Sequence, residues 1–243
     1  IVKLITPGFS PEQISKTSFL TRLMFLSPIF FGLSSVFSGI LQYFNRFLIY
    51  GLTPILYNLG IYLLNGLTYI LAPFNTKVKL WVEGRKEWES KISGRIKPED
   101  KSIWIHCASL GEFEQGRPVI EAMKSERPDL KVVLTFFSPS GYEVRKNYDK
   151  ADCIIYLPVD TPFNAERFIN LINPEFVILV KYEFWNNYIS ELYRQKIPVY
   201  LVSGIFRQGQ HFFSWYGSFF RNMLRKFEMI FVQDHTSLEL LSG

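Results

Sequence analysis

The stretch "WIHCASLGEFEQGRPVIEAM", residues 104–123, contains the change of pattern that decides the fold. It begins with a short, nearly continuous apolar run, turns at Ser109 and Gly111, and continues with apolar residues at helical spacing. A short continuous apolar run is typical of a strand that is buried on both faces. The stretch is therefore predicted to be a strand, a tight turn and a helix, with Glu112 at the start of the helix.

The same pattern repeats along the rest of the chain. Short runs of apolar, β-branched and aromatic residues occur at 102–108, 131–137, 152–158, 175–181, 199–204 and 229–234. Segments with helical spacing lie between the first five of these runs, at 117–126, 139–148, 162–172 and 183–195. Strands that alternate with helices predict a parallel sheet covered on both faces. We therefore expect an α/β fold, a Rossmann-like doubly wound parallel sheet, over residues 102–243.

The N-terminal region, residues 1–76, is predicted to be membrane-associated. It contains two uncharged runs, 23–45 and 47–76, and each is at least as long as the about 20 residues that span a bilayer. The second run carries Tyr and Asn throughout, so it could lie in the membrane interface instead of crossing. The alternative interpretation is a buried helical hairpin of a soluble protein.

A charged connector, residues 77–101, follows the apolar region and is predicted to be partly helical. Its first ten residues include four basic side chains, Lys77, Lys79, Arg85 and Lys86. Basic residues accumulate on the cytoplasmic side of membrane segments. The remainder of the chain is therefore expected to face the cytoplasm.

Charge and cysteine content exclude two classes of protein. The formal net charge is +5, but residues 1–76 hold four basic residues against one acidic residue, so the rest of the chain is close to neutral. It lacks the basic surface of a nucleic-acid-binding protein, and no nucleic-acid partner is expected. Cys107 and Cys153 each lie inside a strand-like run and form no CxxC motif. Both are predicted to be reduced core residues.

Ligands of doubly wound sheets bind at the carboxyl ends of the strands, so the turns after the strands are the candidate sites. In the first turn, Gly111 is expected to permit a positive φ and the close approach of a ligand beside Ser109. Glu112 then has two interpretations. It is either a general base for a substrate hydroxyl or an acidic residue favoured in the first helical turn by the helix dipole.

The second and third turns add polar groups. Ser138, Ser140 and Gly141 offer hydroxyl and backbone N–H groups at a helix start, where an anion or a sugar could bind. The same residues also suit a loop without a ligand. Asp160 and Thr161 precede the next helical segment, and either one could cap it.

The fourth and fifth turns contain charged residues. Lys181 and Glu183 follow the fourth strand, where such a pair is often only a solvated ion pair. Arg207 follows the fifth strand and is a candidate phosphate partner. The aromatic and basic segment 211–227 suits either a membrane-facing patch for a phosphorylated lipid or a core helix with a basic outer face.

Taken together, these turns resemble one family. The segment "IHCASLGEFEQGRPVIEAM" resembles the H-x-x-S-x-G-E … R-P-[LI] segment of the lipid A-specific 3-deoxy-D-manno-octulosonic acid (Kdo) transferases. The resemblance continues through "LTFFSPSGYE", "YLPVDTPFNAERFINLINPEFVILVKYEFWNNYI" and "VSGIFR". It covers residues 60–243, including the apolar run before "LWVEGRK".

The resemblance implies the N-terminal, acceptor-side half of a GT-B glycosyltransferase of lipopolysaccharide biosynthesis, bound to the inner membrane. Such an enzyme transfers Kdo from CMP-Kdo to a hydroxyl of a lipid A precursor with inversion, and Glu112 would be its general base. The polar residues of the other turns would bind substrate, and no metal or cofactor is implied. The donor-binding half would lie outside this chain, which would be inactive alone.

One departure from the family pattern concerns Lys181. Many relatives carry Glu there, assigned to transition-state stabilisation, whereas Glu183 matches the second Glu of that segment. Lys181 could instead bind the leaving phosphate or a lipid phosphate. Two further hypotheses remain open: a membrane-tethered module that binds a phosphorylated lipid without chemistry, and a GT-B transferase for another acceptor.

Overall fold

The computed structural model describes residues 10–12, 15, 46–214 and 217–242. The chain divides into two compact units, residues 1–55 and 56–243. The first apolar run, 23–45, lies outside the described residues, so its crossing of a membrane stays a prediction.

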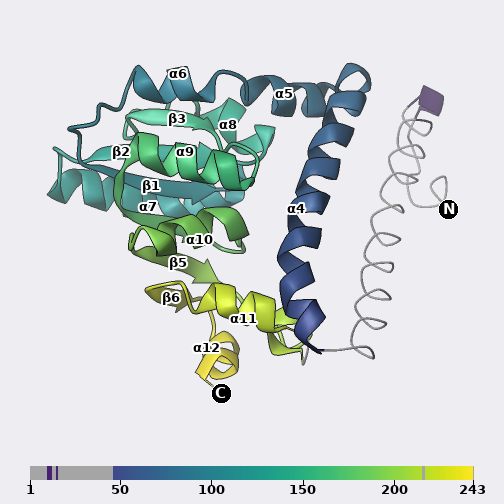
Figure 1. The fold of residues 1–243 in the computed structure, drawn as a ribbon. Helices are drawn as coiled ribbons and strands as arrows, with labels where there is room; N and C mark the ends of the chain where they lie inside the picture. The colour runs from purple at the N-terminus through teal and green to yellow at the C-terminus, as the bar shows by residue number, and fades with distance from the viewer. Residues whose placement is uncertain (1–9, 13–14, 16–45, 215–216, 243) are drawn as a thin grey trace. The chain divides into compact units, whose positions relative to one another are not determined.

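The second unit is built on a six-stranded sheet in which every pair of neighbours is parallel (Figure 1). The strand order is β3-β2-β1-β4-β5-β6, which is the order of a doubly wound Rossmann sheet. The strands are β1 (Ser102–Cys107), β2 (Lys131–Phe136), β3 (Cys153–Tyr156), β4 (Pro174–Val180), β5 (Val199–Gly204) and β6 (Met229–Val232). All six predicted strands and the predicted fold class are confirmed.

Helices cover both faces of the sheet. One face packs against α7 (Leu110–Glu126) and α8 (Pro139–Arg145), and the buried residues there include Phe113, Ile120 and Phe136. The other face packs against α6 (Trp88–Ser93), α9 (Pro162–Ile172), α10 (Asn186–Arg194) and α11 (Ser218–Leu224). Both cysteines are unpaired and buried in these two cores, as predicted.

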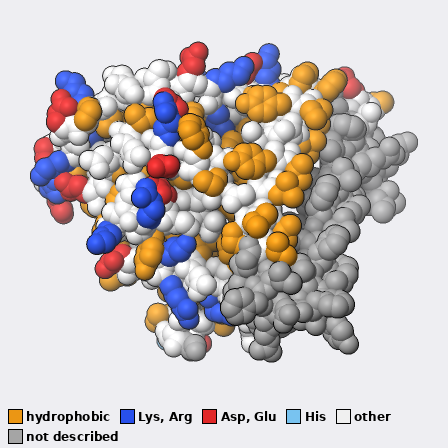
Figure 2. Space-filling view, in the orientation of Figure 1, with side chains coloured by type: hydrophobic (Ala, Val, Ile, Leu, Met, Phe, Trp, Pro, Cys, Tyr) orange, Lys and Arg blue, Asp and Glu red, His pale blue; other side chains and the backbone are white. Residues whose placement is uncertain are grey.

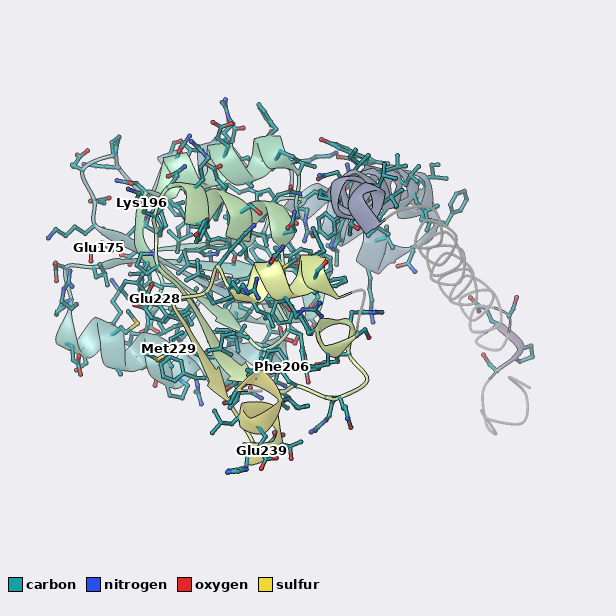
Figure 3. The ribbon with its side chains drawn as sticks, turned by 60° about the horizontal axis from the view of Figure 1, so that its bottom comes forward. Glu175, Lys196, Phe206, Glu228, Met229 and Glu239 are labelled. Carbon is teal, nitrogen blue, oxygen red and sulfur yellow. The ribbon has the colours of Figure 1, made fainter. Side chains whose placement is uncertain are left out.

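The parallel strands give the sheet two chemically different edges. In Figure 3, Glu175, Lys196, Glu228 and Met229 mark the amino ends of β4, β5 and β6, and they lie together on one side. Phe206 follows the carboxyl end of β5 and lies farther along the strands. The candidate turns are therefore all at the edge opposite the labelled amino ends.

The C-terminal segments differ in part from expectation. Residues 211–227 do not form one helix, because the 3-10 helix η2 (His211–Phe213) and α11 are separated by a break. Phe212 and Met223 are buried in the core, which supports the core interpretation of this segment over a membrane-facing patch. The chain described here ends with α12 (His235–Ser242).

The second apolar run forms a helix with two different faces. Residues Leu52–Phe74, which comprise most of α4 (Arg46–Leu71) and the 3-10 helix η1 (Ala72–Phe74), are long and apolar enough to cross a membrane. The polar and aromatic side chains of α4, Tyr57, Asn58, Tyr62, Asn65 and Tyr69, share one face at helical spacing.

The two faces of α4 have different neighbours. Tyr57 donates a hydrogen bond to Asp160 Oδ2 at 2.5 Å, and Asn58 Oδ1 accepts one from Asn187 at 2.9 Å. The opposite face carries exposed apolar side chains, including Leu63 and Ile70, and Figure 2 shows such side chains gathered along this helix. Within this run, Tyr57 and Asn58 are thus residues that bind the sheet domain.

The connector packs closely on the sheet domain. It forms α5 (Thr76–Gly84) and α6, so the expected partial helicity is present. Ile92 and Ile96 are buried in the core, and Arg85 is 9% exposed. A segment that is rich in charge thus contributes buried residues at regular intervals.

Candidate functional site at the carboxyl ends of β1 and β4

The strand order reverses between β1 and β4. From β1 the chain proceeds to β2 and β3 on one side, and β4 then returns to the other side of β1. In open α/β sheets, ligands bind in the crevice beside such a switch point. The turn after β1 carries Glu112, and the turn after β4 carries Lys181 and Glu183.

Glu112 lies in the first turn of α7 and interacts with the residue that caps this helix. Ser109 has an extended backbone and is the N-cap, and its N–H donates to Glu112 Oε2 at 3.0 Å. A Ser followed three residues later by Glu is the capping-box pattern of a helix start. Glu112 therefore has a structural role at the start of α7.

Glu183 belongs to a buried chain of hydrogen bonds. His106 Nε2 lies 3.0 Å from Glu183 Oε2, and Trp185 Nε1 donates to the same oxygen at 2.6 Å. On the other side of the imidazole, His106 Nδ1 lies 2.8 Å from Thr135 Oγ1, which accepts from Trp104 Nε1 at 2.7 Å. The ion pair with Lys181 that the sequence suggested is not among the described salt bridges.

These partners assign the tautomer of His106. Indole N–H groups only donate, so Thr135 Oγ1 accepts from Trp104 and its own hydrogen is available to His106 Nδ1. A neutral imidazole then carries its proton on Nε2 and donates it to Glu183. In this arrangement all of the named polar atoms are satisfied, as burial requires. His106 and Glu183 are 7% exposed or less, so the chain fixes the carboxylate rigidly.

The two carboxylates influence each other. Burial raises the pKa of Glu112 above its ordinary value, and the negative charge of Glu183 raises it further, while backbone hydrogen bonds from Ser109 and Ala108 act in the opposite direction. A carboxylate with a raised pKa is a stronger base than an exposed one. Perturbed carboxyl groups of this kind are characteristic of functional sites.

Two turns of the site contain strained backbone. Lys181, directly after β4, has a φ of 69°, and Ser203, at the end of β5, has a φ of 59°. Both are residues with a Cβ in the left-handed region, which costs about 1–3 kcal/mol each and concentrates at functional sites. The turn after β4 is therefore held in a specific conformation that places Lys181 at the switch point.

The two expected glycine roles have different outcomes. Gly111 lies inside α7 without a positive φ, so the expectation that its backbone needs glycine is wrong; a Cβ there would meet nothing within 4 Å. The absence of a side chain at Gly111 leaves open space beside the first turn. At Gly141 a Cβ would lie 2.3 Å from the Phe136 ring and 3.1 Å from the Ser109 carbonyl carbon. Glycine is therefore required where α8 passes the first turn.

The remaining predicted residues are placed less centrally. Ser138 and Ser140 are hydrogen-bonded to each other through their hydroxyl groups at 2.7 Å, and Ser138 is the N-cap of α8. Arg207 is exposed and pairs with Asp234 at 3.3 Å. No described contact joins Arg207 to Glu112 or Glu183, so the structure does not bring it into the same cluster.

Asp160 and Thr161 were both expected as caps of the same helix, but they interact with the starts of two different helices, α10 and α9. Thr161 caps α9 by accepting from Asn164 N at 3.2 Å. Asp160 instead accepts from Asn187 N and Tyr188 N at the start of α10, besides Tyr57. Burial raises the pKa of Asp160 to about 6. This carboxylate joins α4, the β3 turn and α10.

Metal ligation has no described candidate. In residues 10–12, 15, 46–214 and 217–242, no group of three or more His, Cys, Asp or Glu side chains is arranged to hold an ion.

Comparison with known proteins places the sheet domain in a family. A family model described as 3-deoxy-D-manno-octulosonic-acid transferase (kdotransferase) matches residues 85–242. The transferase of Haemophilus influenzae is 30% identical over 142 residues, which are 58% of this chain and 33% of that protein. That of Aquifex aeolicus is 33% identical over 140 residues, 57% of this chain and 35% of that protein. The chain thus spans about a third of the length of these relatives.

Two other kinds of similarity were found. Residues 1–75 match a second family model, described as the lipid II flippase MurJ, and most of them lie outside the described residues. Among solved structures, a UDP-N-acetylglucosamine 2-epimerase has a TM-score of 0.45 at 12% identity, covering 59% of this chain and 45% of that one. MurG of Acinetobacter baumannii has a TM-score of 0.41 at 13% identity, covering 56% and 42%.

The first family model covers well over half of the chain and includes all six strands together with the turns that carry Glu112 and Glu183. The expected resemblance of residues 60–84 lies outside this match. From residue 85 onward, the chain belongs to the 3-deoxy-D-manno-octulosonic-acid transferase family.

Proposed function

We propose that this chain is the acceptor-side half of a membrane-bound GT-B glycosyltransferase that transfers Kdo from CMP-Kdo to a lipid A precursor. The observation that carries the proposal is the pair of carboxylates at the switch point. Glu112 has a raised pKa, and Glu183 is held by His106 and Trp185. Family membership supplies the sugar, whereas the donor, the acceptor and the mechanism are proposed.

In the proposed reaction, Glu112 is the general base. One of its oxygens accepts the Ser109 N–H, which fixes the carboxylate in place. The other takes the proton of the acceptor hydroxyl as that oxygen attacks the anomeric carbon of Kdo and CMP leaves from the opposite face, with inversion. Open space at Gly111 gives the acceptor access to the carboxylate.

The other residues have supporting roles. The fixed charge of Glu183 keeps Glu112 basic, since it raises the pKa of that carboxyl. Lys181, in its left-handed conformation beside the pair, is a cation for the phosphate of the leaving group or of the lipid. Ser109, Ser138, Ser140 and the close approach at Gly141 shape the acceptor side, and Arg207 serves a more distant phosphate.

The membrane location is proposed on the same basis. The apolar face of α4 suits the acyl region of a bilayer, and the basic residues after it suit the cytoplasmic side of the inner membrane. The lipid acceptor would then reach the carboxyl edge of the sheet from the bilayer. No nucleic-acid partner and no cofactor enter this scheme.

The test uses membranes that contain the protein expressed from its complete gene. They are incubated with CMP-Kdo and a tetra-acylated lipid A precursor, and the lipid mass is followed. Glu112→Gln keeps an oxygen for the Ser109 N–H but cannot accept the proton, so we expect a rate loss of about 10²–10⁴-fold. Glu114→Gln is the matched control, because Glu114 lies on the same helix, is half-buried and pairs with Arg117 and Arg145.

A second candidate function is favoured by the capping bond of Glu112. That bond is what a purely structural glutamate would make, so the domain could bind a phosphorylated lipid without chemistry. Lipid binding with no gain in mass would support this candidate. A mass gain that survives Glu112→Gln at the wild-type rate would return Glu112 to its helix-start role.

A further inference from the structure

A cavity of ≈ 370 Å³ lies between α4 and the sheet domain. Its walls come from α4, from the α5–α6 segment and from the turn between β3 and α9. Five aromatic side chains line it: Tyr62, Tyr69, Trp81, Trp88 and Phe163. None of the residues assigned to the transfer reaction belongs to this lining.

Arg85 is the one charged side chain in the lining of this cavity. Its guanidinium group donates to three backbone carbonyl oxygens, those of Trp81 at 3.1 Å, Phe137 at 2.9 Å and Leu157 at 2.8 Å. It also lies over the Trp81 ring, 3.8 Å from the centroid. A guanidinium has five N–H groups, so these bonds leave two of them to a further acceptor.

The charge of Arg85 has no counter-ion in the described part of the chain. No described carboxylate forms a salt bridge with it, and its neighbours are carbonyl groups and aromatic rings. Burial accordingly lowers its pKa to about 9. A buried charge without a partner is costly, and such a charge beside a cavity is stabilised when an anion enters.

We propose that this cavity binds the phosphate headgroup of an anionic glycerophospholipid, with Arg85 as the partner of the phosphate. A single cation matches the single negative charge of a phosphodiester, and the two remaining N–H groups match two of its oxygens. The volume suits one phosphate and its glycerol. Tyr62 and Tyr69 lie at the rim of the cavity. Their side chains are amphipathic, which suits the membrane interface.

The surroundings of the cavity favour a lipid over a soluble phosphate. Tyr62 and Tyr69 are about half exposed at the rim, and the exposed apolar face of α4 continues from them through Leu59, Leu63 and Ile70. Acyl chains can therefore lie along this helix while the headgroup occupies the cavity. The site is independent of the transfer reaction, so it stands or fails separately from the proposed function.

The test is native mass spectrometry of the whole chain in detergent, with phosphatidylglycerol as the probe and diacylglycerol, which lacks the phosphate, as the comparison. We expect one retained phosphatidylglycerol and at least about tenfold weaker retention of diacylglycerol, because diacylglycerol offers no negative charge to Arg85. Arg85→Gln should weaken phosphatidylglycerol retention at least about tenfold, the loss expected for charge-assisted hydrogen bonds. Arg194→Gln, a change of the same charge at an exposed residue paired with Glu191, should leave it unchanged.

A second variant guards against a folding defect of Arg85→Gln. Asn65→Trp places a large side chain in the cavity and leaves the partners of Arg85 unchanged, so it should also abolish retention while circular dichroism stays native. Retention of phosphatidylglycerol by both variants at the wild-type level would overturn the proposal. So would equal retention of both lipids, or displacement of the lipid by glycerol 3-phosphate at equal concentration, which would identify a site for free phosphate.

Discussion

At the scale of single residues, the site combines structural and chemical roles in the same side chains. Glu112 completes a helix start and also has a raised pKa, and Asp160 caps a helix that lies 27 residues later in the chain. Lys181 has a left-handed backbone directly after β4. A residue can therefore satisfy a local rule of secondary structure and still be available for chemistry.

The pH dependence of transfer should report on the carboxylate pair. Glu183 raises the pKa of Glu112, so Glu183→Gln removes a negative charge and lowers that pKa. A base with a lower pKa is deprotonated at lower pH, and the acidic limb of the kcat/KM profile should move to lower pH. The position of this limb is the measurement, since the height of the profile changes if Glu183 also contacts substrate.

Glu114→Gln is the control for this profile. Glu114 lies on α7 within two residues of Glu112 but pairs with Arg117 and Arg145, so the acidic limb should stay in place. An acidic limb that is identical in the wild type and in Glu183→Gln would show that the base is not coupled to Glu183.

At the scale of secondary structure, apolar periodicity was enough to locate the strands, because strands buried on both faces are continuous in hydrophobicity. The same reasoning placed Glu112 at a helix start. It could not reveal the bond between His106 and Glu183, which are 77 residues apart, or the capping of α10 by Asp160. The sequence placed Arg85 only among the basic residues after the apolar run, because its carbonyl partners Phe137 and Leu157 follow β2 and β3, far away in the sequence.

The two glycines at the candidate site provide a test of packing. Gly141→Ala should destabilise the domain by about 1–3 kcal/mol, because its Cβ would overlap the buried Phe136 ring. Gly111→Ala should stabilise it by about 0.5–1 kcal/mol, since the space there is open and alanine favours a helix. Chemical denaturation of both variants, compared with the wild type, measures the two changes. Equal effects of the same sign would contradict the close approach of α8 to the first turn.

At the scale of the second unit, α4 is part of the sheet domain and not a free anchor. Its polar face binds Asp160 and Asn187, and its apolar face is exposed. We therefore propose that α4 lies in the membrane interface, with one face on the sheet domain and the other on lipid. The alternative that the sequence left open, a buried helical hairpin of a soluble protein, includes residues outside the described part of the chain and stays untested.

Vesicle flotation can test the membrane role of α4. Leu63 is 63% exposed on the apolar face, so Leu63→Asp should reduce binding to anionic vesicles at least about tenfold through lost apolar burial and an added charge. Val144→Asp is the matched control, because Val144 is 58% exposed on α8. Both variants should retain native circular dichroism. Unchanged flotation of Leu63→Asp would exclude this face as the membrane contact.

The bonds of Tyr57 and Asn58 to the carboxyl edge of the sheet have a consequence for how substrate is found. They tie the helix to the turn after β3 and to α10, so in the proposed membrane-bound enzyme the carboxyl edge of the sheet would keep a constant height above the headgroups. Encounter with the proposed lipid acceptor would then be a search in two dimensions, governed by the density of acceptor in the leaflet. The proposed water-soluble donor would bind from the aqueous phase. The loading rate of the acceptor would therefore depend on its density in the leaflet, and that of the donor on its concentration in solution.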